Sequence, residues 1–259
     1  MPIHLIPTIK RAASLLGVVL ALFQLASGQD APPYRDAKRP VEQRVADLLS
    51  RMTLEEKVAQ LEGVWENRQF PLDPKTLFVD EKNAFLPDRA ALVLKNGLGE
   101  MSRPSEQRGP RAMAEFTNTM QKWMKDNTRL GIPVLFHEEC LHGHVAMKGT
   151  SYPQAIALAS TWDPSLVHEV FSATAAEVRA RGAQQCLAPV LDLARDPRWG
   201  RTEETYGEDP YLTSRIGVAA VTGFQGVGPF IDKAHVLATA KHFAVHGQPE
   251  GGTNVGPGN

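Results

Sequence analysis

CLAPVLDLARDPRWGRTEETYGEDPY, residues 186–211, joins a short apolar run to a long charged loop. The run Leu187 to Leu193 follows a glycine turn at Gly182 and is too short for a helix, so it predicts a buried strand. The chain then breaks at Asp196-Pro197, and a new helix is expected to begin near Pro210. A buried strand that opens into a charged loop is how an α/β barrel builds a binding site.

The loop combines guanidinium groups, an indole and carboxylates: Arg198, Trp199, Arg201, Glu203, Glu204, Glu208 and Asp209. Charged groups hydrogen-bond hydroxyls strongly, and an aromatic ring stacks on the apolar face of a sugar, so the set suits a neutral polyhydroxylated ligand. A simpler alternative is that Arg201 and Glu204, spaced i and i+3, form a local ion pair worth about 0.5 kcal/mol that fixes the loop. Both interpretations are open at this point.

Outward from this stretch, apolar runs alternate with segments of helical periodicity. Strands are expected at 131–136, 187–193 and 236–243, with a short one after the Asn96-Gly97-Leu98-Gly99 turn; helices are expected at 41–52, 53–61, 111–126, 164–181 and 210–224. This alternation predicts βα units with a parallel sheet, an α/β fold of the (β/α)8 TIM-barrel type. Polar clusters at 137–144, 198–209 and 241–246 each follow a strand, so they are expected to converge on one face.

Composition narrows the classes of partner. The 259 residues are 42% hydrophobic, enough for a sizeable core. The net charge is -1, and the sequence contains no long basic or acidic run. Nucleic acid is therefore not expected as a partner. Residues 1–28 read as a signal peptide, with Lys10 and Arg11 before the apolar stretch Ala12 to Ala26, which predicts a secreted or periplasmic protein with no membrane association after cleavage. Residues 29–40 are expected to be an extended lead-in, and 41–259 a barrel domain.

The cysteines and histidines raise two further questions. Cys140 and Cys186 lie in apolar, strand-like contexts, and we expect them to be free, small hydrophobic residues rather than a disulfide. His137, His142 and His144 suggest a metal-dependent hydrolase, yet a zinc-binding helix needs histidines at i and i+4, and position i+4 here is Leu141. We therefore expect no metal site.

Four segments together resemble glycoside hydrolase family 3: Arg44 to Gln60 (RVADLLSRMTLEEKVAQ), Ile132 to Gly143 (IPVLFHEECLHG), Asp196 to Tyr211, and Lys241-His242-Phe243 followed by Glu250-Gly251-Gly252. The resemblance covers the chain from Tyr34 onward. It implies a retaining exo-β-glycosidase that needs no cofactor and acts on an oligosaccharide or glycoside. It also implies sugar-binding roles for Glu139, Arg201, Lys241 and His242, with Glu204 orienting Arg201 and Arg198 in a structural role.

The residue at position 139 bears on the substrate. Glucosidases of the family often have Asp where this chain has Glu139, whereas many xylosidase-like members have Glu. One extra methylene fills space that a hexose hydroxymethyl group needs, so the resemblance favours terminal β-D-xylosyl over β-D-glucosyl residues.

The resemblance also implies catalytic residues that are not found in this sequence. The family's nucleophile is an Asp in a later Ser-Asp-Trp-like segment, and its acid/base is usually a Glu on a following domain, so we expect both beyond Asn259. The chain is expected to hold about half of the barrel's βα units, which would make it a fragment. A catalytically inactive sugar-binding fragment is then the alternative function, and unpaired strand edges predict marginal stability and aggregation.

Overall fold

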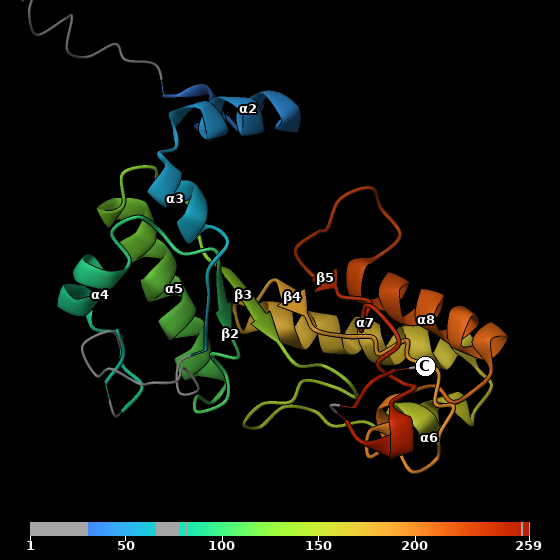
Figure 1. Cartoon of the computed structure of the whole chain (residues 1–259). Helices are drawn as coiled ribbons and strands as arrows, with labels where there is room; N and C mark the ends of the chain where they lie inside the picture. The colour runs from blue at the N-terminus through green and yellow to red at the C-terminus, as the bar shows by residue number, and fades with distance from the viewer. Residues whose placement is uncertain (1–30, 66–77, 81, 255, 259) are drawn as a thin grey trace, which may run out of the picture. The chain divides into compact units, whose positions relative to one another are not determined.

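The structure, a computed structural model, describes residues 31–65, 78–80, 82–254 and 256–258 (Figure 1). The chain divides into two compact units, residues 1–53 and 54–259. The expected signal peptide at 1–28 lies outside the described residues. The division falls within the range 41–259, for which the sequence predicts one barrel domain.

The described part of the first unit contains α-helix α2 (Val41–Arg51), where the sequence predicts a helix over 41–52. Part of the expected extended lead-in instead forms a short 3-10 helix, η1 (Pro33–Arg35). The backbone N–H of Tyr34 donates to the Asp47 carboxylate at 3.1 Å, and Arg44 Nε donates to the Tyr34 carbonyl at 3.0 Å. These hydrogen bonds fix η1 against α2.

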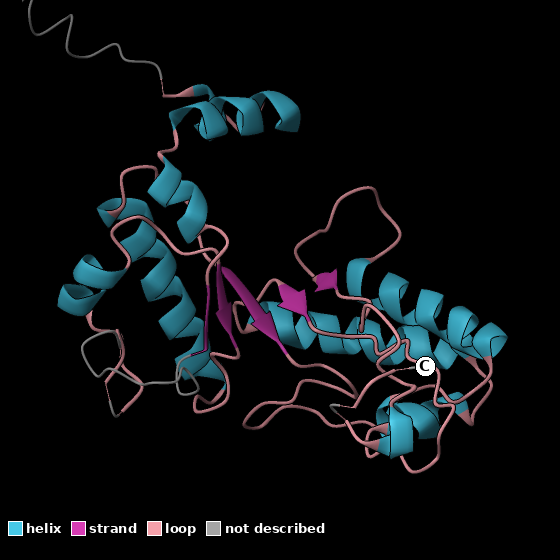
Figure 2. Cartoon of the chain, in the orientation of Figure 1, coloured by secondary structure: helices cyan, strands magenta, loops and turns pink. Residues whose placement is uncertain are grey.

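The second unit is built on a parallel sheet of β1 (Gly63–Trp65), β2 (Glu100–Ser102), β3 (Leu135–Glu138), β4 (Gln185–Cys186) and β5 (Leu237–Ala238), in that order. Figure 2 shows the strands between the helices. Every neighbouring pair is parallel. Strands that follow one another in sequence order are the arrangement of successive strands in an α/β barrel. The predicted parallel α/β fold is confirmed.

Helix α3 (Leu54–Ala59) precedes β1, and the connections between the strands contain α4 (Pro87–Val93), α5 (Pro110–Asn127), α6 (Ala155–Ala159), α7 (Pro164–Ala180) and α8 (Pro210–Gln225). The three longest lie within two residues of their predicted bounds. Asp163 and Asp209 cap α7 and α8, because each carboxylate accepts two backbone N–H groups of the first turn. Neither α4 nor α6 was predicted, and α3 ends at Ala59 rather than at residue 61.

Three predicted strands were wrong in extent. The strand expected at 236–243 is observed only as Leu237–Ala238, and proline explains the other two. β4 ends at Cys186, although the strand was expected at 187–193, because Pro189 has no N–H for the ladder. Backbone pairing resumes beyond it, where Leu191 N–H donates to the Lys241 carbonyl at 2.7 Å. The strand expected at 131–136 begins only at Leu135, two residues after Pro133.

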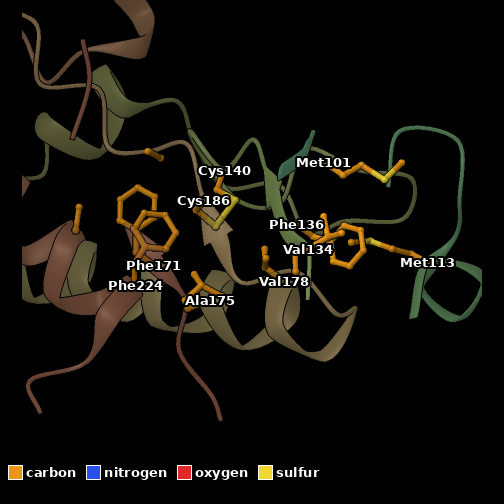
Figure 3. Close-up of a cluster of buried hydrophobic side chains, with 14 of the residues drawn as sticks. Met101, Met113, Val134, Phe136, Cys140, Phe171, Ala175, Val178, Cys186 and Phe224 are labelled. Carbon is orange, nitrogen blue, oxygen red and sulfur yellow. A yellow bond between two sulfur atoms is a disulfide. The ribbon is translucent and has the colours of Figure 1, made fainter. Parts of the chain in front are cut away.

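The core of this unit lies between the sheet and its helices. Figure 3 shows Phe171 of α7 against Phe224 of α8, with ring centroids 4.7 Å apart. Figure 1 shows the two helices side by side. Met101 and Phe136, on adjacent strands, are fully buried next to each other in the ladder. This packing holds the strand ends in fixed positions.

A disulfide bond joins Cys140, just after β3, to Cys186, the last residue of β4, with Cα atoms 5.6 Å apart (Figure 3). The expectation of free cysteines was therefore wrong. Their apolar, buried context was correctly recognised, but Cys186 pairs with Glu138 in the ladder, and this register brings it beside the residue two positions after Glu138. Among the described residues, no helix combines the length and the apolar character that crossing a membrane requires.

Candidate functional site

Charged and histidine side chains gather where β2 and β3 end and in the loops after β4 and β5. We call this group the strand-end cluster: Arg103, Glu139, Asp192, Arg201, Glu204, Lys241, His242 and His246. In a parallel sheet the carboxyl ends of the strands share one edge, which is where barrel enzymes carry their binding loops. The convergence predicted for the three polar segments is therefore observed for members of each segment.

Glu139 is the carboxylate that joins three strand ends. Lys241 Nζ donates to Oε2 at 3.0 Å, and Arg103 Nη2 donates to Oε1 at 2.8 Å. The side chains of Glu139 and Lys241 are 13% and 14% exposed. Both carboxylate oxygens are thus neutralised by cations yet keep lone pairs that can accept hydrogen bonds from a ligand.

Arg103 follows β2 and has a left-handed backbone, with φ of 49°. Its Nη1 donates to Glu106 at 3.2 Å, and the guanidinium carbon lies 4.5 Å from the centroid of the Trp65 ring. Trp65 Nε1 in turn donates to Glu106 at 3.2 Å. Sequence reasoning missed Arg103; the one signal was its position directly after the short strand expected past Gly99.

Arg201 and Glu204 form a two-pronged ion pair, with Nε and Nη2 donating to the two carboxylate oxygens at 2.9 and 2.6 Å. Arg201 immediately precedes the 3-10 helix η2 (Thr202–Glu204) and Glu204 is its last residue, which places both side chains on one side of the loop. The hydrogen bond to Glu204 raises the pKa of Arg201. The predicted local pair is therefore present within the strand-end cluster, so the two interpretations of this loop are compatible.

His242 and His246 connect the β4 and β5 loops. His242 Nδ1 lies 2.6 Å from Oδ2 of the buried Asp192, and His246 Nε2 lies 2.9 Å from Arg201 Nη1. The two imidazole rings pack edge to face, with centroids 4.4 Å apart. Since Lys241 and His242 are consecutive, the Glu139 group and the Arg201 group form one continuous arrangement.

Gly247 allows the β5 loop to approach the β4 loop. A Cβ atom at this position would lie 2.7 Å from the Leu193 carbonyl oxygen and 2.9 Å from Asp192 Cβ. Real Cβ atoms do not approach other atoms so closely, so any larger residue would push the loops apart. A glycine here brings His246 to Arg201.

Beneath the strand-end cluster lies a second, fully buried carboxylate. Glu138 accepts hydrogen bonds from the backbone N–H of Ser105 at 3.1 Å and from its hydroxyl at 2.5 Å. His144 Nε2 lies 3.4 Å from the same carboxylate. Glu138 therefore anchors the loop that carries Arg103, from the opposite side of β3 to Glu139.

The other polar residues of the three segments serve different purposes. Arg198, with a side chain 70% exposed, pairs with Asp196 and holds the pKa of that carboxyl at about 2, whereas the Arg201 side chain is 26% exposed. His142 Nδ1 lies 3.0 Å from the Tyr152 carbonyl oxygen, while His144 faces Glu138. Across the described ranges, no group of three or more His, Cys, Asp or Glu side chains is placed to hold a metal ion.

The strand-end cluster contains all five residues for which the sequence suggests sugar binding: Glu139, Arg201, Glu204, Lys241 and His242. It adds Arg103, Asp192 and His246, to which sequence reasoning gave no binding role. Three carboxylates, two guanidinium groups, an ammonium and two imidazoles supply many strong hydrogen-bond donors and acceptors at low net charge. Such a surface suits a neutral ligand rich in hydroxyls.

Comparison with known proteins agrees with this chemistry. Residues 53–259 match the profile "Glycosyl hydrolase family 3 N terminal domain". A β-xylosidase from Formosa agariphila is 50% identical over 137 residues, which cover 50% of this chain and 19% of that protein. A periplasmic β-glucosidase from Salmonella typhimurium is 32% identical over 209 residues, covering 80% of this chain and 24% of that protein.

The fold is found in solved structures as well. A β-glucosidase from Erythrobacter marinus superposes with a TM-score of 0.76 at 36% identity, covering 89% of this chain and 29% of that one. The chain thus spans less than a third of the length of each of these three relatives. The profile match over residues 53–259, the parallel sheet and the similarity to these relatives show that the chain belongs to glycosyl hydrolase family 3, through its N-terminal domain.

Proposed function

We propose that this chain supplies the subsite of a retaining exo-β-glycosidase that holds the terminal, non-reducing sugar of an oligosaccharide or glycoside. The observation that carries the proposal is the Glu139 carboxylate, held by Arg103 and Lys241 from two other strand ends. A carboxylate positioned in this way can accept hydrogen bonds from two hydroxyl groups, while the cations around it donate hydrogen bonds to neighbouring hydroxyl oxygens. Relatives named as β-xylosidases and β-glucosidases support the same class of substrate.

Arg201 and His242 complete the proposed subsite. Two of the three guanidinium nitrogens of Arg201 are bound to Glu204, and Nη1 contacts His246, which leaves N–H groups on Nη1 and Nη2 for a ligand. Asp192 holds Nδ1 of His242 and thereby directs Nε2 toward other partners. Hydrogen bonds of this kind can strengthen as a sugar ring distorts toward the transition state.

The choice between a pentose and a hexose rests on Glu139. Because both of its oxygens are fixed by Arg103 and Lys241, the extra methylene relative to aspartate cannot swing aside without breaking an ion pair. The space it occupies is then denied to a hydroxymethyl group. We therefore favour a β-D-xylosyl over a β-D-glucosyl residue, a discrimination worth about 1 to 3 kcal/mol.

Glycosidic hydrolysis needs a carboxylate nucleophile and a second carboxyl group as acid and base. The three carboxylates of the strand-end cluster each have a cationic or imidazole partner: Glu139, Asp192 and Glu204. We assign them to binding and orientation and not to either catalytic role. This pairing also favours the second candidate function, a sugar-binding chain without hydrolysis of its own.

We further propose residues 1–28 as a signal peptide, 29–40 as a lead-in and 41–259 as a barrel domain. Export to the periplasm or the extracellular space agrees with the periplasmic location in the name of the Salmonella relative. A disulfide between Cys140 and Cys186 is also typical of proteins from oxidising compartments.

Titration of the purified 259-residue chain with methyl β-D-xyloside and methyl β-D-glucoside, followed by calorimetry and saturation-transfer NMR, tests the proposal. We expect both to bind, the xyloside more tightly. The Arg201→Gln variant should lose binding. Arg198→Gln should retain it, because Arg198 lies three residues before Arg201, outside the strand-end cluster, and pairs with Asp196 of its own loop. Equal binding by both variants would refute the assignment, and Glu139→Asp should shift the preference toward the glucoside.

Turnover separates the two candidate functions. Hydrolysis of p-nitrophenyl β-xyloside or β-glucoside that disappears in Lys241→Ala would place a nucleophile within these residues and contradict the purely binding role of the three carboxylates. Sugar binding without turnover would favour the non-hydrolytic alternative for this chain.

A further inference from the structure

The contact between Arg201 and His246 links two loops that are 45 positions apart in sequence. The ion pair with Glu204 fixes Arg201 only to its own loop, because Arg201 immediately precedes the 3-10 helix whose last residue is Glu204. His246 belongs to the β5 loop, which also carries Lys241 and His242. The hydrogen bond from Arg201 Nη1 to His246 Nε2, 2.9 Å long, therefore sets one half of the strand-end cluster relative to the other.

We infer that His246 is a positioning residue of the sugar subsite, and that its neutral Nε2 lone pair accepts an N–H of Arg201 and holds the guanidinium toward the bound sugar. A guanidinium group has no acceptor and always carries its charge, so a contact with imidazole requires an unprotonated nitrogen on the histidine. Nδ1 must then carry the proton. This inference rests on the proposed function for its ligand but not for the contact itself.

The surroundings of His246 favour the neutral ring. Burial, followed by the neighbouring His242 and Arg201, lowers the pKa of His246, while the carboxylates of Asp192 and Glu204 act in the opposite direction. Those two carboxylates are already engaged, with His242 and Arg201 respectively. The His246 ring also packs nearly perpendicular to the ring of buried Trp199, with centroids 5.4 Å apart.

Protonation would reverse the contact. An imidazolium has no lone pair at Nε2 and would place a second positive charge beside the guanidinium, so Arg201 would turn away from it. Because the folded-state pKa lies below the ordinary histidine value near 6.5, this change occurs on the acid side of that value. Sugar affinity is therefore expected to fall as the pH is lowered through the pKa of His246.

The contact can be tested without any sugar. Long-range ¹H–¹⁵N correlation spectra of the chain labelled at histidine report the tautomer and the pKa of each ring. We expect His246 to be neutral at pH 7 with the proton on Nδ1, and its pKa to rise in Arg201→Gln. An Nε2–H tautomer, or a ring that is charged at pH 7, would overturn the inference.

Sugar affinity between pH 5 and 8 tests the positioning role. The wild-type chain should bind methyl β-D-xyloside more weakly at pH 5 than at pH 7.5. His246→Gln keeps an acceptor oxygen but cannot titrate, so it should bind with nearly wild-type affinity at pH 7.5 and lose most of this pH dependence. His246→Phe keeps an aromatic ring without an acceptor and should bind about tenfold more weakly at both pH values.

The outcomes are separable. If the sugar affinity of His246→Gln falls at low pH as much as that of the wild type, the pH dependence comes from another group, such as His242. That result would overturn the positioning role. Wild-type affinity in His246→Phe would do the same. If His246→Phe fails to fold, the pH dependence of sugar affinity in His246→Gln and the tautomer of His246 observed by NMR still test the positioning role. A wild-type chain that binds no sugar at any pH would refute the proposed function, and the NMR result alone would then decide the Arg201–His246 pairing.

Discussion

Lys241 Nζ lies 3.0 Å from Glu139 Oε2, and this contact joins residues 102 positions apart. Arg103 reaches the other oxygen of the same carboxylate. One side chain therefore draws together the loops after β2, β3 and β5, and the strand-end cluster is built from charges that balance each other. The arrangement makes the charges interdependent.

Removing the carboxylate should cost more than removing one cation. Glu139→Gln leaves Lys241 without its carboxylate partner and Arg103 paired only with Glu106, whereas Lys241→Met leaves Glu139 paired with Arg103. We expect Glu139→Gln to lower the free energy of unfolding by about 1 to 3 kcal/mol and Lys241→Met by less. Urea unfolding of both variants and of the double variant measures this; additive effects would show that Lys241 and Glu139 are not coupled.

Reduction of the disulfide should destabilise the second unit. Cys140 and Cys186 enclose a loop with a sequence separation of 46, and breaking such a link typically costs about 2 to 4 kcal/mol. Chain secreted into an oxidising compartment should show no reactive thiol in denaturant and two after reduction. Cys140→Ala combined with Cys186→Ala should match the reduced wild type in urea. Two reactive thiols before reduction would contradict the bond.

Gly247→Ala should separate the β4 and β5 loops, since the added methyl group meets the Leu193 carbonyl and Asp192 Cβ below 3.0 Å. We expect a loss of about 1 to 3 kcal/mol in stability together with weaker sugar binding. Gly200→Ala is the matched control, because a Cβ there has no atom within 4 Å although it neighbours Arg201. Calorimetric titration and thermal unfolding compare the two; equal effects would remove the special role of Gly247.

The stability of the fold should depend on pH through His137. Burial lowers the pKa of His137, and the carboxylates of Glu100, Glu138 and Glu139 only partly oppose it. Below the ordinary pKa near 6.5, His137 binds a proton in the unfolded chain but not yet in the folded chain. The free energy of unfolding therefore decreases as the pH is lowered, until the pH reaches the lowered pKa of His137 in the folded state. The urea midpoint between pH 5 and 7 should vary less in His137→Gln than in wild type or in His168→Gln. An unchanged slope in His137→Gln would contradict this assignment.

The parallel α/β organisation was predictable because long elements leave a periodic pattern. The helix expected at 111–126 is observed at Pro110–Asn127, since a proline starts it and apolar residues at helical spacing bury one face. The short helices α4 and α6 span seven and five residues, too few for a periodicity to emerge. Prolines 133 and 189 shortened two strands that hydrophobicity alone would have extended.

For the strand-end cluster, motif residues were predictable and their partners were not. Glu139, Arg201 and Lys241 stand in recognisable segments, whereas Arg103 is an isolated arginine whose importance depends on a carboxylate 36 positions away. The cysteine pair was missed for the same reason. Sequence spacing carries no information on which strand ends become neighbours, and that depends on the register of the sheet.

Glu138 and Glu139 are chemically identical and adjacent, yet they point to opposite sides of the chain, one buried in the interior with Ser105 and the other partly exposed in the strand-end cluster. Under the proposed function, a substitution of Glu138 would cause a folding defect, whereas a substitution of Glu139 would change the sugar specificity. Efforts to redesign the range of accepted sugars should therefore vary position 139 and leave 138 untouched. A mutational survey that treats the two glutamates as one class would average two unrelated phenotypes.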